Sequence, residues 1–214
     1  MRNKKLIIFD IDDTLIFTYK NIYFKSNIAF KNLWIESLSY DKFIDYYRRN
    51  TFLDYVKKMN LSNSHYNSFL DLYKKAWNDI WLKSIWNIKN LIFYYINQWY
   101  DIWIITNWFW ISTYKKLTFL NINPFIFKFI LHADNLKFLK PSNNIFNMIL
   151  KNELIKYSNV YYIWDWIIDY KSTINTKVEF IGVLTWLETK QSFNTMWVKN
   201  KNIICDIMAL KNII

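Results

Sequence analysis

The chain has 214 residues, 53% of them hydrophobic, and a net charge of +11, so it can bury the core of one large domain or of a domain with an insert. Its single cysteine excludes an internal disulfide and a cysteine-based zinc site, and its N-terminus does not resemble a secretory signal peptide. The most apolar window, residues 91–111, is broken by polar side chains, so we expect a soluble, cytoplasmic protein without a membrane partner.

Glycine and tryptophan occur in unusual numbers. Average usage predicts about 15 glycines for this length, whereas the sequence has 1 glycine and 12 tryptophans. Glycine serves positions with positive φ and places where the backbone approaches a ligand. The chain is rich in residues with AT-rich codons, and the codon UGA is read as Trp in some lineages and as Gly in others. We therefore hypothesise that many of these tryptophans are glycines in the native protein; the alternative is a genuinely tryptophan-rich chain.

The positive charge is compatible with a nucleic-acid partner, with an anionic small substrate, or with AAA-rich codon usage. The lysines are scattered, without a run of five or more like charges. A basic nucleic-acid-binding module therefore remains an alternative, and we expect no nucleic-acid partner.

The first predicted elements are a strand and a helical segment. Residues 5–9 (KLIIF) form an apolar run that ends at acidic residues, which is typical of a buried strand. From about residue 20 to residue 86, aromatic and aliphatic residues recur at helical spacing, which predicts roughly three to five helices.

Strands and helices alternate after residue 86. Strands are predicted at 100–107, 125–131, 160–163, 178–184 and 201–206, and helices at 87–98, 112–121, 141–152, 167–176 and 207–214. This alternation predicts an α/β fold with a doubly wound, mostly parallel Rossmann-like sheet, which binds ligands at the carboxyl ends of its strands.

Polar side chains stand where these predicted strands end. They are Asp10 and Asp12 after the first strand, Thr106 after the second, Asp165 and Asp169 after the fourth, and Lys140 before a helix. The parallel arrangement gathers them at one edge of the sheet. Crowded carboxylates raise each other's pKa, and a bound cation relieves that repulsion. Oxygen ligands without His or Cys suit Mg²⁺, while a lysine and a hydroxyl suit phosphate oxygens, so the group fits phosphoryl transfer.

Four stretches in this order resemble the motifs of the haloacid dehalogenase-like (HAD) hydrolase superfamily. They are FDIDDTL (9–15), IITN (104–107), LKPSNNIF (139–146) and YIWDWIID (162–169). The resemblance covers essentially the whole chain. It implies a HAD-like core formed by residues 1–17 and 87–214, with an inserted helical cap at 18–86 as in the phosphoglycolate-phosphatase-like branch.

The resemblance also implies a Mg²⁺-dependent phosphatase acting on a small phosphorylated metabolite. Asp10 would be the nucleophile that forms an aspartyl-phosphate, and Asp12 the general acid and base. The expected metal ligands are Asp10, the Ile11 carbonyl, Asp12, Asp165 and Asp169. Thr106 and Lys140 would hold the phosphoryl oxygens, aided by backbone N–H groups near Asn107.

Several alternatives stay open at this stage. Asp10, Asp12 and Asp13 could form a solvated acidic turn that caps a helix, and Lys137 could stand in for Lys140. Asp169 could pair with Lys140 rather than touch metal. A phosphomutase on the same fold is possible, and the substrate and oligomeric state are undetermined.

Six tryptophans fall where this family commonly has glycine: Trp86, Trp99, Trp108, Trp164, Trp186 and Trp197. Trp99 also follows a predicted helix end, where glycine is favoured. If Trp108 and Trp164 are real, they would crowd the phosphate pocket, and the chain would be a catalytically inactive binding protein.

Overall fold

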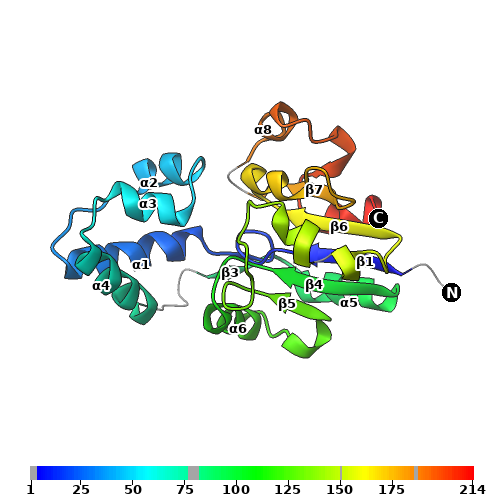
Figure 1. Cartoon of the computed structure of the whole chain (residues 1–214), viewed down its shortest axis with the longest axis horizontal. Coiled ribbons are helices and arrows are strands. Elements are labelled where there is room, and N and C mark those ends of the chain that lie inside the picture. The colour runs from blue at the N-terminus through cyan, green and yellow to red at the C-terminus, as the bar shows by residue number, and fades with distance from the viewer. Residues whose placement is uncertain (1–3, 77–81, 150, 186–187) are drawn as a thin grey trace. The chain divides into compact units, whose positions relative to one another are not determined.

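The computed structural model describes residues 4–76, 82–149, 151–185 and 188–214 and has the expected α/β fold (Figure 1). By its internal contacts the chain divides into two compact units, Met1–Ile16 with Ser84–Ile214, and Phe17–Lys83. Two short strands, β2 (Ile16–Phe17) and β3 (Lys83–Ser84), pair with each other where the chain passes between these units.

The larger unit is built on a six-stranded parallel sheet with the order β5-β4-β1-β6-β7-β8. The strands are β1 (Lys5–Phe9), β4 (Tyr100–Ile105), β5 (Phe129–Leu131), β6 (Asn159–Trp164), β7 (Glu179–Val183) and β8 (Ile203–Ile204). The chain reverses its direction of travel across the sheet at β1, which lies between β4 and β6. A parallel sheet binds ligands at such a switch point, outside the carboxyl ends of the strands.

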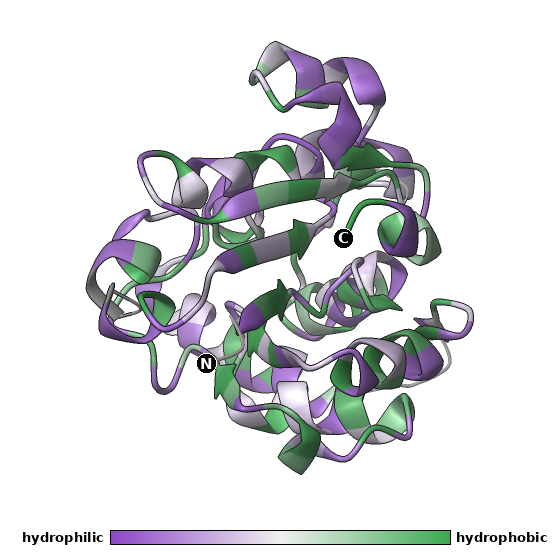
Figure 2. Cartoon of the chain, turned by 90° about the vertical axis from the view of Figure 1, so that its right-hand side faces the viewer, coloured by the Kyte–Doolittle hydropathy of each residue, from purple (hydrophilic) through white to green (hydrophobic). Residues whose placement is uncertain are grey.

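The central position of β1 in the sheet explains why its short run of residues is continuously apolar. Its register pairs Ile7 with Ile102 on one side and with Tyr161 on the other. Leu6 to Phe9 have no exposed surface, as expected for a strand covered on both faces. Figure 2 shows hydrophobic stretches, in green, on the strands and on the helices that flank them.

Helices flank this sheet (Figure 1). Its helical elements are α5 (Ile88–Asn97), α6 (Trp110–Phe119), η2 (Pro124–Ile126), η3 (Ile145–Ile149), α7 (Lys151–Leu154), η4 (Ile167–Thr173), α8 (Lys190–Thr195), η5 (Asn200–Asn202) and η6 (Ile207–Asn212). Several of them are shorter than the sequence predicts or are not α-helical. In particular, η3 is a π-helix, and η4 and η6 are 3₁₀-helices.

The strand predicted at 125–131 was wrong in its first half. Pro124 starts the 3₁₀-helix η2, and the Asn123 side chain accepts a hydrogen bond of 3.0 Å from the backbone N–H of Phe125. This local cap removes residues 124–126 from the sheet, so that β5 begins only at Phe129. In the same way, the last predicted strand (201–206) begins with η5 and keeps only two residues in β8.

The smaller unit contains α1 (Tyr19–Asn32), α2 (Tyr40–Tyr47), α3 (Phe52–Lys58) and α4 (Asn63–Lys75). Its core is aromatic. The Phe30 ring stacks on Phe69 with centroids 4.5 Å apart, and Phe43 meets Tyr55 edge to face at 5.0 Å. These are favoured geometries for aromatic pairs, so the recurring Phe and Tyr residues of this segment act as core rather than as a base-stacking surface.

Within the described ranges, none of the helices combines the length and the apolar character needed to span a bilayer.

Candidate active site

The polar residues predicted from strand ends lie at the carboxyl ends of three adjacent strands. Asp10 follows β1, Thr106 follows β4, and Asp165 follows β6. Each of these side chains is buried, with 5% or less of its residue surface exposed. The parallel register of β1 with β4 and β6 places the three strand ends side by side.

Lys140 connects two of these strand ends. Its Nζ donates a hydrogen bond of 2.7 Å to Asp10 Oδ1 and another of 3.1 Å to the carbonyl oxygen of Ile105. The lysine is 4% exposed, and a buried ammonium requires such partners. Lys137, considered above as a substitute, is exposed, and its Nζ lies over the Phe138 ring. Lys140 is therefore the lysine that the fold brings to the strand ends.

Asn107 fixes the segment that carries this lysine. Its side-chain amide donates to the carbonyl of Lys140 at 3.0 Å and accepts from the Lys140 backbone N–H at 2.9 Å. Both ends of the Asn107 amide are thus used on the protein backbone. A phosphate contact at this residue would have to come from its main chain rather than its side chain.

Thr106 and Thr14 add two hydroxyl groups to the polar residues of the site. The Thr106 hydroxyl accepts a hydrogen bond of 3.3 Å from the backbone N–H of Trp108. The Thr14 hydroxyl donates to Asp165 Oδ1 at 2.9 Å, and Thr14 is fully buried. Thr14 was missed as an individual site residue, although it lies within the FDIDDTL stretch.

The buried carboxyls carry strongly perturbed proton affinities. Burial raises the pKa of Asp10 to about 6, with Lys140 acting in the opposite direction. Burial raises the pKa of Asp169 to about 8, again opposed by Lys140. The pKa of Asp165 is also raised well above its usual range, first by burial and then by the charges of Asp13 and Asp10. Clustered groups with perturbed pKa values are typical of functional sites.

Asp169 is held close to this group by η4. Its Oδ2 atom is buried and has no hydrogen-bond partner among the residues that the structure describes. The ion pair of Lys140 is formed with Asp10 instead. A buried carboxylate oxygen without a partner is costly, and such an oxygen is a natural acceptor for a cation or a bound water.

Asp12 pairs with a second buried lysine, Lys116, rather than with Lys140. Both of its carboxylate oxygens accept hydrogen bonds from Lys116 Nζ, at 2.5 and 2.7 Å. Lys116 lies on α6 and is 4% exposed. The sequence reasoning missed this lysine, although a signal existed: Thr113, Lys116 and Leu117 follow the i, i+3, i+4 spacing of a buried helix face.

The carboxylate oxygens of this site are ligands that suit Mg²⁺, although the described residues hold no compact group of three metal-binding side chains. Among the described residues, no three His, Cys, Asp or Glu side chains are grouped as a metal site. Mg²⁺ keeps several waters and usually binds through only one or two carboxylates. Asp10 and Asp165 offer such a pair. The charge of Asp10 helps to raise the pKa of Asp165, and a bound cation would oppose that effect.

Two tryptophans lie against the lysines of this site. The Lys140 Nζ is 2.8 Å from the centroid of the Trp164 ring, and the Lys116 Nζ is 4.9 Å from the centroid of Trp108. The Trp164 ring therefore occupies the space directly beside the Lys140 ammonium. Trp186, another tryptophan at a position where the family commonly has glycine, lies outside the described residues.

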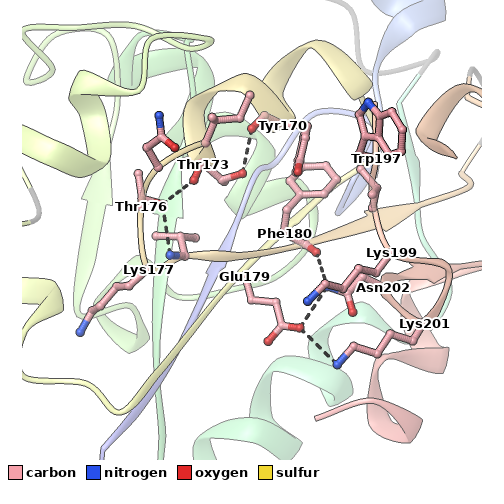
Figure 3. Close-up of a pocket in the computed structure, with 14 residues that line it drawn as sticks. Tyr170, Thr173, Thr176, Lys177, Glu179, Phe180, Trp197, Lys199, Lys201 and Asn202 are labelled. Atoms are coloured by element: carbon pink, nitrogen blue, oxygen red, sulfur yellow. Dashed lines mark hydrogen bonds and ion pairs between the residues drawn. The ribbon is translucent and has the colours of Figure 1, made fainter. Parts of the chain in front are cut away.

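A separate pocket of about 660 Å³ lies at the amino ends of β7 and β8 (Figure 3). Its lining includes Lys177, Glu179, Trp197 and Asn202. The Lys177 Nζ donates to the carbonyl of Tyr157 at 2.8 Å, and the Asn202 amide donates to Glu179 and to the carbonyl of Phe180 at 3.0 Å each. None of the predicted site residues lines it.

Comparisons with known proteins agree with this fold. The profile of the family described as "Haloacid dehalogenase-like hydrolase" matches residues 7–183. A comparison with curated protein sequences finds no match. Among solved structures, a predicted phosphoglycolate phosphatase from Haemophilus somnus 129pt is 18% identical with a TM-score of 0.78, covering 100% of this chain and 99% of that one.

Two further structures show the same likeness. A haloacid dehalogenase-like hydrolase candidate from Bacteroides fragilis is 18% identical (TM-score 0.77), covering 96% of this chain and 98% of that one. A candidate beta-phosphoglucomutase from Thermotoga maritima is 13% identical (TM-score 0.72), covering 98% of this chain and 100% of that one. At these identities the likeness shows the fold, whereas the sequence profile spans most of the chain. The protein therefore belongs to the haloacid dehalogenase-like hydrolase family.

Proposed function

We propose that this protein is a Mg²⁺-dependent phosphatase that hydrolyses a small phosphomonoester through an aspartyl-phosphate on Asp10. The observation that carries the proposal is the Lys140 ammonium, buried between Asp10 Oδ1 and the Ile105 carbonyl where β1 and β4 end. It places a fixed positive charge beside a carboxylate nucleophile, which is the arrangement that phosphoryl transfer requires.

Each residue of the site has a proposed task. Asp10 attacks phosphorus in line with the leaving oxygen, and Asp12 gives that oxygen a proton. Asp12 then takes a proton from the water that attacks the aspartyl-phosphate, so that phosphate leaves and Asp10 is restored. Thr106 and Lys140 hold phosphoryl oxygens, while Asn107 keeps the Lys140 backbone in place.

The carboxylates of Asp10 and Asp165, together with the Ile11 carbonyl, would hold Mg²⁺, with Asp12 and Asp169 in its surroundings. When bound, the ion supplies neutralisation of the charge that develops on the phosphoryl group. The buried Asp169 Oδ2 atom supports an extra ligand in this region, because it has no hydrogen-bond partner among the residues that the structure describes.

The test is phosphate release from p-nitrophenyl phosphate and from a panel of sugar, nucleoside and carboxylic acid phosphates, with Mg²⁺ and with EDTA. We expect release with Mg²⁺ that stops with EDTA and in Asp10→Asn. Turnover that persists in Asp10→Asn would refute the nucleophile. An isomerised sugar phosphate without free phosphate would favour a phosphomutase instead.

A second candidate follows from the short distance between Trp164 and Lys140. If the tryptophan is present in the native protein, it fills the phosphate position, and the chain is a catalytically inactive binding protein on the same fold. Failure of the whole substrate panel in a chain verified to contain Trp164 would favour this candidate.

A further inference from the structure

Lys116 is a buried lysine whose charge is directed at Asp12. Its Nζ lies 2.5 Å from Oδ1 and 2.7 Å from Oδ2, so one ammonium contacts both carboxylate oxygens. The two side chains are 5% and 13% exposed. An ion pair so shielded from water is held far more firmly than a surface pair.

The position of Lys116 follows from its helix. Thr113, Lys116 and Leu117 are the buried residues of α6, so Lys116 lies on the face of the helix that is turned away from solvent. The adjacent Lys115 is exposed. The helix therefore offers two neighbouring lysines, one exposed and one buried against Asp12.

We propose that Lys116 is a positioning residue that holds the Asp12 carboxylate in the orientation needed for proton transfer. The proposal rests on the general acid and base role proposed for Asp12 above. Proton transfer requires the donor oxygen to lie within about 2.6–3.2 Å of its partner. An aspartate free to rotate would lose that geometry for part of the time, whereas the contact of both oxygens with one ammonium selects a single orientation.

The test compares two substrates that differ in their need for a general acid. p-Nitrophenolate leaves readily without protonation, while an alkoxide does not. The value of kcat/KM reports the steps up to phosphoryl transfer, in which the leaving group departs. In Lys116→Met, we expect kcat/KM for an alkyl phosphate to fall at least about tenfold more than for p-nitrophenyl phosphate, since general acid catalysis contributes about 10²–10⁴-fold.

Matched variants make the result specific. Lys115→Met, one residue away on the same helix, should leave both values near wild type. Lys116→Arg should restore part of the alkyl phosphate activity, because it keeps a cation beside Asp12. An equal loss on both substrates in Lys116→Met, or no loss, would overturn the positioning role.

Asp12→Asn separates this inference from the proposed function. If Asp12→Asn lowers kcat/KM equally for the alkyl phosphate and for p-nitrophenyl phosphate, the acid role of Asp12 itself is wrong. If Asp12→Asn instead lowers kcat/KM more for the alkyl phosphate, adding Lys116→Met to this variant should not change the ratio of the two kcat/KM values further. This double variant also removes both charges, so it leaves no unpaired buried ion if Lys116→Met alone is unstable. A further change in the ratio would contradict action through Asp12.

A second inference comes from three tryptophans that occupy the same place after a helix. Trp34, Trp99 and Trp197 each follow the C-cap residue, of α1, α5 and α8. Their φ angles are +57°, +66° and +64°. At least 75% of each residue is exposed, so none gains much from burying its ring.

Two of these helix ends form the full Schellman hydrogen-bond pattern. After α1, Trp34 N–H donates to Lys31 O and Ile35 N–H to Phe30 O. After α8, Trp197 N–H donates to Asn194 O and Val198 N–H to Phe193 O. This pattern requires the left-handed conformation, which glycine adopts freely and a residue with a Cβ adopts at a cost of roughly 1–2 kcal/mol.

The other helix ends show which residues this conformation normally selects. Asn60 follows the C-cap of α3 and Asn121 that of α6, with φ of +50° and +52°. Asparagine is the usual alternative to glycine at this place. Tryptophan has no comparable reason to be there.

We infer that Trp34, Trp99 and Trp197, together with Trp164, are glycine in the native protein. Trp164 joins them on separate grounds, because its ring occupies the space directly beside the Lys140 ammonium, in the predicted phosphate pocket. A glycine at 164 would leave that space for a phosphoryl oxygen.

The first test is peptide mass spectrometry on protein isolated from its source organism, across residues 34, 99, 164 and 197. Glycine at these positions supports the inference, and tryptophan at the three helix ends overturns it. The second uses recombinant chains: Trp99→Gly should raise Tm more than Trp99→Ala does, because only glycine relieves the left-handed strain. Equal effects of Gly and Ala would contradict the conformational argument.

Discussion

The two ends of the parallel sheet differ in whether they bury a group of like charges. At the carboxyl end, Asp10, Asp165 and Asp169 are buried with raised pKa values, and Asp169 Oδ2 has no hydrogen-bond partner among the described residues. At the amino ends of β7 and β8, the pocket in Figure 3 is lined by Lys177 and Asn202, whose amine and amide groups donate to neighbouring oxygens.

This difference separates function from stability. Buried like charges cost folding free energy, so a fold that keeps them together implies a use for them. At the other end, the Lys177 amine and the Asn202 amide nitrogen donate to protein oxygens, although the buried Asn202 Oδ1 atom has no hydrogen-bond partner among the described residues. Substitutions at the carboxyl end should therefore reduce activity, whereas those at the amino end should reduce stability.

The largest expected effect is that of Asp10→Asn. Loss of the nucleophile should lower kcat by at least about 10³-fold, because the amide cannot form the acyl-phosphate. Circular dichroism and phosphate release on the same preparation would show a folded, inactive protein. Asp71→Asn, exposed on α4, is the matched control and should keep full activity. An active Asp10→Asn enzyme would remove the distinction between the two ends.

Lys140→Met should lower kcat/KM by about 10²–10³-fold, since a buried charge that contacts the transferring group contributes about 2.7–4 kcal/mol. Steady-state kinetics with p-nitrophenyl phosphate would measure this loss. Lys137→Met, an exposed lysine three residues away, should behave as wild type. Equal losses in the two variants would mean that Lys140 contributes only general positive charge.

The pH dependence of stability provides a third comparison. The pKa of Asp169 is raised to about 8 from 3.8 in the metal-free fold, so the folded state binds its proton more tightly than the unfolded chain does. Stability is then greatest below the unfolded pKa and falls as the pH rises through the folded pKa. We expect the Tm of EDTA-treated protein to decrease between pH 5 and 8.

Asp169→Asn should make this decrease shallower, and Mg²⁺ should do the same in the unmodified chain if it binds the carboxylates. Differential scanning calorimetry across this pH range would measure both. A Tm that rises with pH from 5 to 8, or an unchanged slope in Asp169→Asn, would contradict the assigned direction.

The smallest effect on activity is expected at the amino end. Asn202→Ala removes the hydrogen bonds to Glu179 and to the carbonyl of Phe180, which should cost about 1–3 kcal/mol of unfolding free energy. Its kcat should stay near wild type. Urea denaturation and phosphate release would test the two statements. A large loss of activity at unchanged stability would give this pocket a functional role.

The predictions from sequence succeeded where a pattern is local. The run at residues 5–9 was assigned as a buried strand, and β1 spans those residues, because a strand covered on both faces needs continuous hydrophobicity. The strand predicted at 125–131 failed in its first half, because Pro124 and the Asn123 side chain form a local 3₁₀ turn that outweighs the apolar pattern there.

The candidate site divides in the same way. Asp10, Thr106, Lys140 and Asp165 were found from sequence, because parallel strands expose the residues that follow them along one edge. Lys116 was missed because its helix position predicts only a buried side chain, not the partner it meets. The ends of α1 and α8 likewise needed the structure to show that Trp34 and Trp197 have positive φ.

The sequence by itself determined the α/β alternation, the family and the polar residues at strand ends, since these depend on hydrophobic period and on short motifs. Only the tertiary structure decided which charges pair. Lys140 meets Asp10 across 130 positions of the chain, and Lys116 meets Asp12 across 104. Such contacts depend on the order of the strands and the packing of α6, which no local pattern encodes, because they arise only when distant segments are buried together.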